Sequence, residues 1–344
     1  MDWTASGIKN EFSFENISVF PPFNPIETYP HTTGGKIARS YDSDYRESLS
    51  IDFDGEESPY SQMIRVWHTA TLEDESVRTC LGTFMRSGGK VEYSRGRASG
   101  SLSYQSNLLR HGTDKRGNDR NVAQGKNVLT FANEIVTNSG GVLIADPSIS
   151  TSKTFSASHV WEFGESVLDE LQRCANALNA IVGVDPYGNV TLKPYLVPSE
   201  RAFSWVLTTD AVLEGLERGD PDIINIVHVS YSPSGSQNAQ FASARLADTD
   251  QRSRAVMGRY AAKTYNINQL STNSVQAQAN LYMAQVNQGR KWSVDMPYMP
   301  LEVGSRGSLI YLDGGEGIVR DCTIESMEIN LDTEMLMSLV LREV

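Results

Sequence analysis

Apolar residues at every second position mark several short segments in the first and last thirds of this 344-residue chain. In "ESLSIDF" (47–53), Leu49, Ile51 and Phe53 alternate with polar residues, and "KWSVDM" (291–296) repeats the pattern. A period of two places alternate side chains on opposite faces of a strand. The pattern predicts antiparallel sheets with one wet face in both thirds of the chain.

Helical spacing of apolar residues occurs mainly between these two regions. Residues 128–135 and 167–178 each carry an apolar stripe with a period near 3.6, and residues 275–286 carry another. Ser166 stands three residues before Asp169, which is a capping-box signal for the start of the second helix. Sheet regions separated by helices predict an α+β fold.

Turn signals divide the strand-like segments. In "AIVGVDPYGNVTLKPY" (180–195), Asp185, Pro186 and Gly188 occupy the first, second and fourth positions of a type I turn. We expect a purely structural hairpin, because backbone geometry explains its turn residues and its tip carries no nucleophile or acid pair. Residues 87–89, Ser-Gly-Gly, predict another hairpin turn.

The first 44 residues have a different composition. Four prolines fall between positions 21 and 30, in "FPPFNPIETYP". Proline fixes φ and removes a backbone donor, so this segment is expected to be an extended arm rather than a helix or central strand.

Charge and cysteine content exclude several classes of protein. The net charge is −12 and the pI is about 5.0, which disfavours a general nucleic-acid binder. The three cysteines lie far apart and form no metal or redox motif, so we expect buried free thiols: Cys80, Cys174 and Cys322. No signal peptide and no membrane-length apolar run is recognised, which favours folding in a cytoplasm.

The sequence matches none of the catalytic or cofactor-binding motifs with which it was compared. The five histidines have no metal-ligand spacing, and no nucleophile-elbow motif occurs. A phosphate-loop match near "RSGGKVE" lacks its first glycine and its final hydroxyl, and a calcium-loop match at 248–259 places Arg252 at a ligand position. Solvated loops are expected to contain Asp220 and Asp222, and also the basic residues of 110–126. No catalytic residue, metal or cofactor is predicted.

The order of segments carries a family resemblance. "WEFGESVLDELQRCANALNAIVGVDPYGNVTLKPYLVP" is followed by "DIINIVHVSYSP", then by "SVQAQANLYMAQ", and finally by "CTIESMEINLDTEMLMSLVLREV". Over residues 40–344 this order resembles the baseplate hub or minor tail proteins at the tail tip of tailed bacteriophages. The helix that leads into "DPYG" and "VTLKPY" is its most telling part.

The resemblance implies two tail-tube-like β-barrel domains joined by a smaller α/β region. Three copies would form a ring that continues the hexameric tail tube at its distal end. The implied division is an N-terminal arm over 1–44, a first barrel over 45–110, an intermediate region over 111–202 and a second barrel over 203–344.

The implied role is structural and not enzymatic, in the virion tail tip after assembly in the host cytoplasm. Expected partners are two further copies of the chain, a distal tail or tail-tube protein, a tape-measure protein, and a tail fibre or spike protein. Genomic DNA would pass through without specific binding.

A channel for DNA should not bind the phosphates tightly, and an acidic wall would repel them. The segments "SIDFDGEE" and "RDCTIESMEIN" are the candidates for a lumen wall, and the alternative is that their acids face outside water. The candidate acids are Asp52, Asp54, Glu56, Glu57, Asp321, Glu325 and Glu328.

Two other functions are consistent with a tail protein. A host-surface carbohydrate binder should display aromatic residues on exposed loops, whereas Trp161, Trp205 and Trp292 lie in or beside regular segments. A tail-associated cell-wall hydrolase should carry an acid pair or a zinc triad, and the sequence shows neither.

Overall fold

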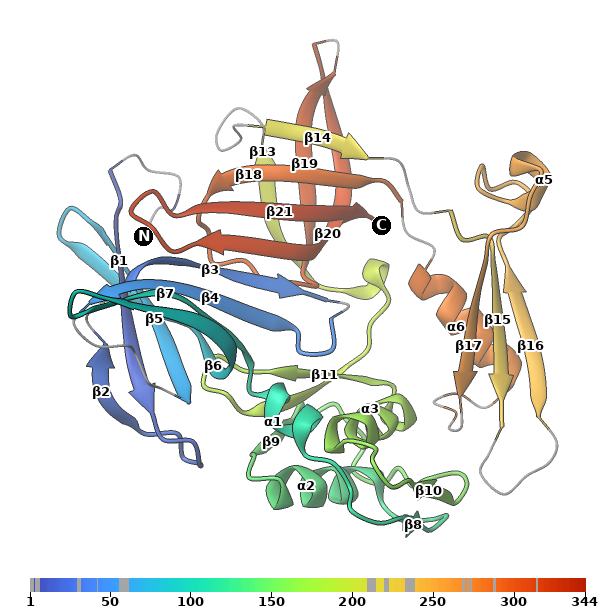
Figure 1. The fold of residues 1–344 in the computed structure, drawn as a ribbon. Helices are drawn as coiled ribbons and strands as arrows, with labels where there is room; N and C mark the ends of the chain where they lie inside the picture. Colours follow the sequence, from blue (N-terminus) through green and yellow to red (C-terminus); the bar gives the residue numbers. More distant parts are fainter. Residues whose placement is uncertain are drawn as a thin grey trace.

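The computed structural model describes residues 3, 7–29, 32–41, 43–55, 62–208, 215–219, 223–232, 239–267, 270, 272, 274–286, 289–313 and 315–344. Most of the strands belong to one large sheet of 13 strands, which curves through the left and centre of Figure 1. These strands are β1 (Lys9–Ile17), β2 (Pro25–Tyr29), β3 (Thr32–Ser40), β4 (Glu47–Gly55), β5 (Met63–Leu72), β6 (Glu75–Ser94), β7 (Arg97–Ser106), β13 (Phe203–Thr208), β14 (Gly215–Gly219), β18 (Lys291–Pro297), β19 (Arg306–Asp313), β20 (Glu316–Asn330) and β21 (Leu336–Glu343).

The main path of this sheet is β14-β18-β21-β20-β3-β4-β7-β6-β5-β1-β2, and β19 and β13 continue it from β20. The pairing of β3 with β20 joins the two β regions that the sequence predicts, and it places Ile37 opposite Ile329. One core lies under both halves, and its buried side chains include Phe84, Tyr104 and Trp292. In the described part of the chain, no pairing joins β2 to β3 or β13 to β14, so neither half closes by hydrogen bonds.

A smaller unit with its own core lies between the two halves in the sequence. It contains α1 (Leu108–Thr113), β8 (Arg120–Val122), α2 (Val128–Asn138), β9 (Leu143–Ala145), β10 (His159–Trp161), α3 (Val167–Leu178), β11 (Ala180–Val184), β12 (Val190–Pro194) and the short 3-10 helix Pro198–Glu200. Helices α2 and α3 pack together over Phe131, Leu171 and Leu192. The structure therefore confirms two of the three helices that the apolar stripes predict, and the overall α+β class.

Local signals set the boundaries of α3 and of the hairpin that follows it. Ser166 and Asp169 form the predicted capping box, with Asp169 N donating to Ser166 Oγ at 3.1 Å. In the turn, Gly188 N donates to Asp185 O at 3.0 Å, and β11 pairs with β12 on either side. The turn packs against the large sheet, because Asn107 donates to Gly188 O and Thr83 to Pro186 O. The hairpin therefore braces this unit against the large sheet, which agrees with the structural role that its turn residues predict.

The N-terminal region differs from the expectation of an arm without a central strand. Strand β1 lies between β5 and β2, and β3 lies between β4 and β20. The prolines explain the error, because Pro21 and Pro22 lie between β1 and β2 and not within a strand. Pro30 lies outside the described residues, and among the described prolines of this segment only Pro25 enters a strand. It is the first residue of β2, at the edge of the sheet, where proline is tolerated.

The hairpin turn expected at residues 87–89 is also wrong. Strand β6 runs straight through these residues, with an irregular register between Arg86 and Gly88 opposite β7. Gly89 has φ +140°, and a Cβ there would lie 2.9 Å from the backbone of Leu102. The glycines therefore serve a bulge. The real turn is at Arg95 and Gly96, both with positive φ.

Residues 223–286 leave the large sheet between its neighbouring strands β14 and β18 and form a third unit, at the right of Figure 1. It contains β15 (Ile226–Tyr231), β16 (Gln240–Arg245), α5 (Arg254–Met257), β17 (Ala262–Ile267) and α6 (Val275–Val286). Strand β15 pairs with β16 and β17, and α6 covers one face over Val229, Ala279 and Met283. We call it the outer module.

The turn at Gly188 yields a test of the fold. Gly188→Val should lower the free energy of unfolding by about 1–3 kcal/mol, because residue 188 has φ +91° and its new Cβ would lie 3.0 Å from Thr83 Cγ2. The measurement is urea unfolding. Gly117→Val is the matched control, since Gly117 has no positive φ and open space at its Cβ. Equal losses for the two variants would contradict the account of the turn.

Candidate functional site

The histidines that could serve catalysis or metal binding lie mainly in the core. His68 Nε2 contacts Asn10 Oδ1 at 2.9 Å, His111 Nδ1 contacts Ser139 Oγ at 2.6 Å, and His159 Nε2 contacts Glu170 Oε1 at 2.7 Å. All three side chains are fully or almost fully buried. Across the described ranges, no group of three His, Cys, Asp or Glu could hold a metal ion. His31, Asp220 and Asp222 lie outside the described residues.

The basic segment 110–126 is only in part the expected solvated loop: residues 114–119 and 123–126 lie outside regular elements and are mostly exposed, but three of its cations are engaged elsewhere. Arg110 belongs to α1 and donates to the carbonyl of Val19, while Arg120 and Lys126 both bind Glu134 on α2, at 2.6 and 3.0 Å. Hydrogen bonds from these two cations lower the pKa of Glu134. These three cations form contacts within the fold that hold α1 and α2 in place. They are therefore not available to bind phosphate.

The three cysteines are free and buried, as the sequence predicts. Trp161, Trp205 and Trp292, which were considered as carbohydrate-binding residues, are each no more than 5% exposed. No helix of the described chain has the length and apolar character needed to cross a membrane.

The most extended polar feature is the outer face of the large sheet, opposite its core. Across the pairing of four strands, Glu328 on β20 lies opposite Ala38 on β3, Ala38 opposite Ser48 on β4, and Ser48 opposite Gln105 on β7. On its other side Glu328 lies opposite Ser338 on β21. The face therefore crosses the junction between the two halves without interruption.

Small hydroxyl side chains dominate this outer face. The alternation that buries Leu49 and Ile51 on β4 turns Ser48, Ser50 and Asp52 outward, and β7 adds serines between its own buried residues. The outward serines of β4, β7, β20 and β21 are Ser48, Ser50, Ser99, Ser101, Ser103, Ser326 and Ser338.

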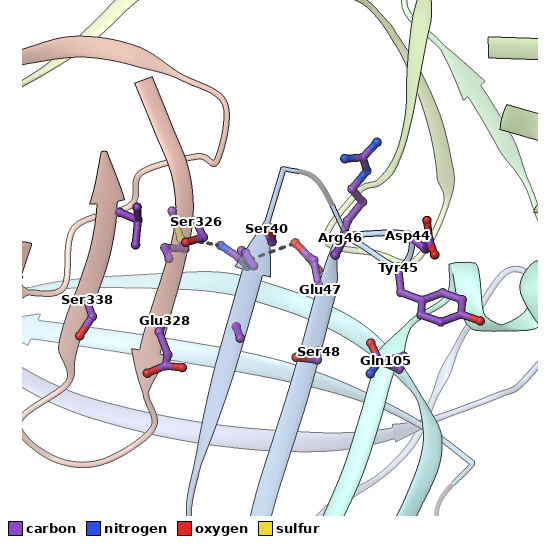
Figure 2. Close-up of a pocket in the computed structure, with 15 residues that line it drawn as sticks. Ser40, Asp44, Tyr45, Arg46, Glu47, Ser48, Gln105, Ser326, Glu328 and Ser338 are labelled. Atoms are coloured by element: carbon purple, nitrogen blue, oxygen red, sulfur yellow. Dashed lines mark hydrogen bonds and ion pairs between the residues drawn. The ribbon is translucent and has the colours of Figure 1, made fainter. Parts of the chain in front are cut away.

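A hollow of about 630 Å³ lies at this junction. Figure 2 shows side chains that line it, with labelled residues from β3, β4, β7, β20 and β21. Arg39 and Glu47 are among the residues that line it, with Arg39 Nε 3.0 Å from Glu47 Oε1. Burial raises the pKa of the Glu47 carboxyl, which Arg39 opposes. Nothing in the sequence singles out this pair, because both residues lie in ordinary alternating strands.

The structure places the described candidate acids on or beside the outer face, but it also pairs most of them. Asp54 binds Arg97 at 3.1 Å, Asp321 binds Arg306 at 2.6 Å, and Glu328 forms an ion pair with Lys36. Glu325 accepts from Arg342 at 3.0 Å and lies 3.4 Å from Lys291. Asp52 is exposed on β4, and Glu56 and Glu57 lie outside the described residues.

The basic side chains of this face are likewise engaged in ion pairs. Lys36, Arg97, Lys291 and Arg342 are each held by one of the acids above, and Lys90 lies 2.6 Å from Glu92. The result is a hydroxyl-rich wall with balanced charge, rather than the purely acidic wall that the segments suggest.

Comparisons with known proteins were made for both sequence and fold. The sequence matches no protein-family model and no curated protein. The fold matches a tail protein from Neisseria meningitidis MC58 with a TM-score of 0.67 and 14% identity, over 97% of this chain and 96% of that one.

Two prophage proteins have the same architecture. The 43 kDa tail protein of prophage MuSo2 from Shewanella oneidensis matches with a TM-score of 0.64 and 12% identity, over 96% of this chain and 98% of that one. Tail protein gp18 of a Listeria monocytogenes EGD-e prophage matches with a TM-score of 0.52 and 8% identity, over 96% and 94%. The chain thus has the fold of tail proteins along almost its whole length, which confirms at the level of fold the resemblance to tail hub and baseplate proteins.

The buried histidines give a pH dependence that can be tested. Burial lowers the pKa of His68 from 6.5 to about 4, so between these values the unfolded chain binds more protons than the folded one. Stability should therefore fall as the pH drops from 6.5 to 4, by up to about 3 kcal/mol for this group. The measurement is urea unfolding at a series of pH values.

His68→Phe is the matching variant, because it keeps a ring beside Phe12 and Tyr298 and removes the titrating group. Its stability should change less over the same pH interval than that of the unmodified protein. Parallel curves for the two proteins would show that His68 is not held neutral by the fold.

Proposed function

We propose that this protein is a structural hub of a phage-type tail tip, and that three copies form a ring at the distal end of the tail tube. The observation that carries the proposal is the outer face of the large sheet, which crosses the β3–β20 junction in a chain that has the fold of tail proteins. In this proposal each half of the sheet is one tail-tube-like barrel domain, and three chains supply the six units of a hexameric tube. The role is structural and involves no catalysis.

The domain division follows from this proposal. Residues 45–110 and 203–344 contribute the two barrel domains, residues 111–202 form the intermediate region, and the first 44 residues add β1, β2 and β3 to the sheet. Residues 223–286, within the second region, project from it as the outer module. The ring would be anchored to a distal tail or tail-tube protein, to a tape-measure protein, and to a fibre or spike protein.

The outer face is proposed to line the channel through which genomic DNA passes. Its serines can exchange hydrogen bonds with water and with phosphate without a net charge, and its cations lie in ion pairs. Binding to DNA gains most from cations that release counterions from phosphate. A wall whose cations are already paired offers little of that gain, so DNA can slide past it.

The assembly state is the direct test of the ring. Purified protein should have a mass three times the 38.0 kDa of one chain, measured by native mass spectrometry over a range of concentrations. A monomer or dimer at every concentration would contradict the proposed ring.

The channel wall can be tested by freeing two of its cations. Asp54→Asn with Glu328→Gln leaves Arg97 and Lys36 without their ion-pair partners, and this variant should gain binding to double-stranded DNA at about 50 mM salt that weakens as salt rises. The measurement is fluorescence anisotropy of labelled DNA.

Glu73→Gln with Asp74→Asn is the control for this experiment, because it removes the same charge from the exposed turn between β5 and β6. The control should bind DNA no better than the unmodified protein. Equal gains in both variants would mean that net charge, and not the pairing on the outer face, limits DNA binding.

A further inference from the structure

The outer module has a charge opposite to that of the rest of the chain. Residues 223–286 contain five Lys or Arg side chains and two Asp or Glu side chains, a net of +3 in a chain of net −12. The sequence has no acidic residue from 251 to 294. A basic unit on an acidic protein favours contact with an acidic surface.

The basic residues gather on a loop that buried polar groups hold in place. We call residues 252–260, at the upper right of Figure 1 around α5, the knob. Asn225 is 3% exposed, and its side chain donates to Arg252 O at 3.1 Å and to Arg259 O at 2.9 Å. The same side chain accepts from Ala261 N at 2.8 Å, and buried Ser253 donates to Asp248 O at 3.1 Å. Both ends of the knob are therefore fixed to the module.

The fixed loop displays apolar side chains to solvent. Val256 is 59% exposed and Met257 36%, while Tyr260 is 46% exposed with Arg254 stacked on its ring at 4.3 Å. Arg259 is also exposed, and among the described residues no acid forms an ion pair with it. Arg, Tyr and Met around a small apolar centre are typical of the energetic centre of a protein interface.

The same chain carries a surface of complementary character. The hairpin of β19 and β20 projects at the top of Figure 1, and we call Leu312, Asp313, Glu316 and Val319 the hairpin tip. Leu312 is 60% exposed and Val319 58%, and Ile310 lies opposite Val319 on the same face. No Lys or Arg occurs from 307 to 319, and the next basic residue, Arg320, lies 3.7 Å from Glu343.

We propose that the knob of one copy docks onto the hairpin tip of a second copy of this chain. Val256 and Met257 would meet Leu312 and Val319 on one face of the hairpin, while Arg254 and Arg259 would reach Asp313 and Glu316, which lie opposite each other at its end. In one chain the two surfaces lie at separate ends of the molecule (Figure 1), so the contact joins different copies. Such a contact uses two different patches and closes into a ring when its rotation permits. The inference rests on the proposed trimer and assigns surfaces to it.

A lipid surface is the alternative occupant of a basic and apolar knob. Two exposed apolar side chains on a fixed loop bury little in a bilayer, whereas stable membrane attachment needs a larger apolar surface or two anchors. The knob therefore fits a protein surface better, and vesicle binding enters the test as an outcome against the proposal.

The test is a reciprocal charge swap measured by analytical ultracentrifugation of the full chain. Arg254→Glu with Arg259→Glu, and separately Asp313→Lys with Glu316→Lys, should each weaken self-association at least tenfold. All four changes in one chain should restore association to within about threefold, because the surfaces become complementary again. The control is Lys115→Glu with Lys193→Glu, which makes the same charge change as the knob variant outside both surfaces and should leave association unchanged.

The outcomes separate this contact from the ring itself. A trimer that survives both reversals overturns the contact and leaves the proposed ring standing, whereas an unmodified protein that is monomeric overturns both. Binding of the unmodified protein to phosphatidylserine vesicles that the knob variant loses would assign the knob to lipid and overturn the docking. If a charge variant fails to fold, Met257→Ser and Leu312→Ser test the apolar part, and each should weaken association.

Discussion

The antiparallel pairing of β3 with β20 is the contact on which the rest of the molecule depends. It aligns Ile37 with Ile329, both fully buried, and makes one sheet and one core from strands at opposite ends of the sequence. Because side chains alternate along a strand, the same register that buries these residues turns Lys36, Ala38 and Glu328 to the outer face. One pairing thus fixes both the core and the polar wall.

Two attached units extend this sheet without interrupting its wall. The intermediate unit braces one side through the turn at Gly188, whose carbonyl binds Asn107. The outer module is inserted between β14 and β18, which still pair with each other. It therefore adds a projecting surface without breaking the hydrogen bonds between these strands. A hub fits this arrangement, because the wall can serve a channel while the projections remain free for neighbouring proteins.

Local signals in the sequence predict the elements that local chemistry determines. The capping box at Ser166 and the turn at Asp185 were predictable because each uses residues a few positions apart. Strands β1 and β3 were not, because nearby prolines mask them, and Gly88 and Gly89 fit a turn and a bulge equally well. The ion pair of Glu328 with Lys36 joins distant parts of the sequence, so the candidate acids were identified without their partners. The fold of the tail proteins was predictable from segment order, whereas the charge balance of the outer face required the three-dimensional register.

Electron cryomicroscopy of the assembled protein, at a resolution that traces strands, tests the central claim most directly. The account predicts a three-fold ring in which the outer faces of β3, β4, β7 and β20 line an open central channel, with Asp52 and Glu328 toward its axis. A ring in which those faces are buried against another protein, or lie on the outside of the particle, would contradict the account.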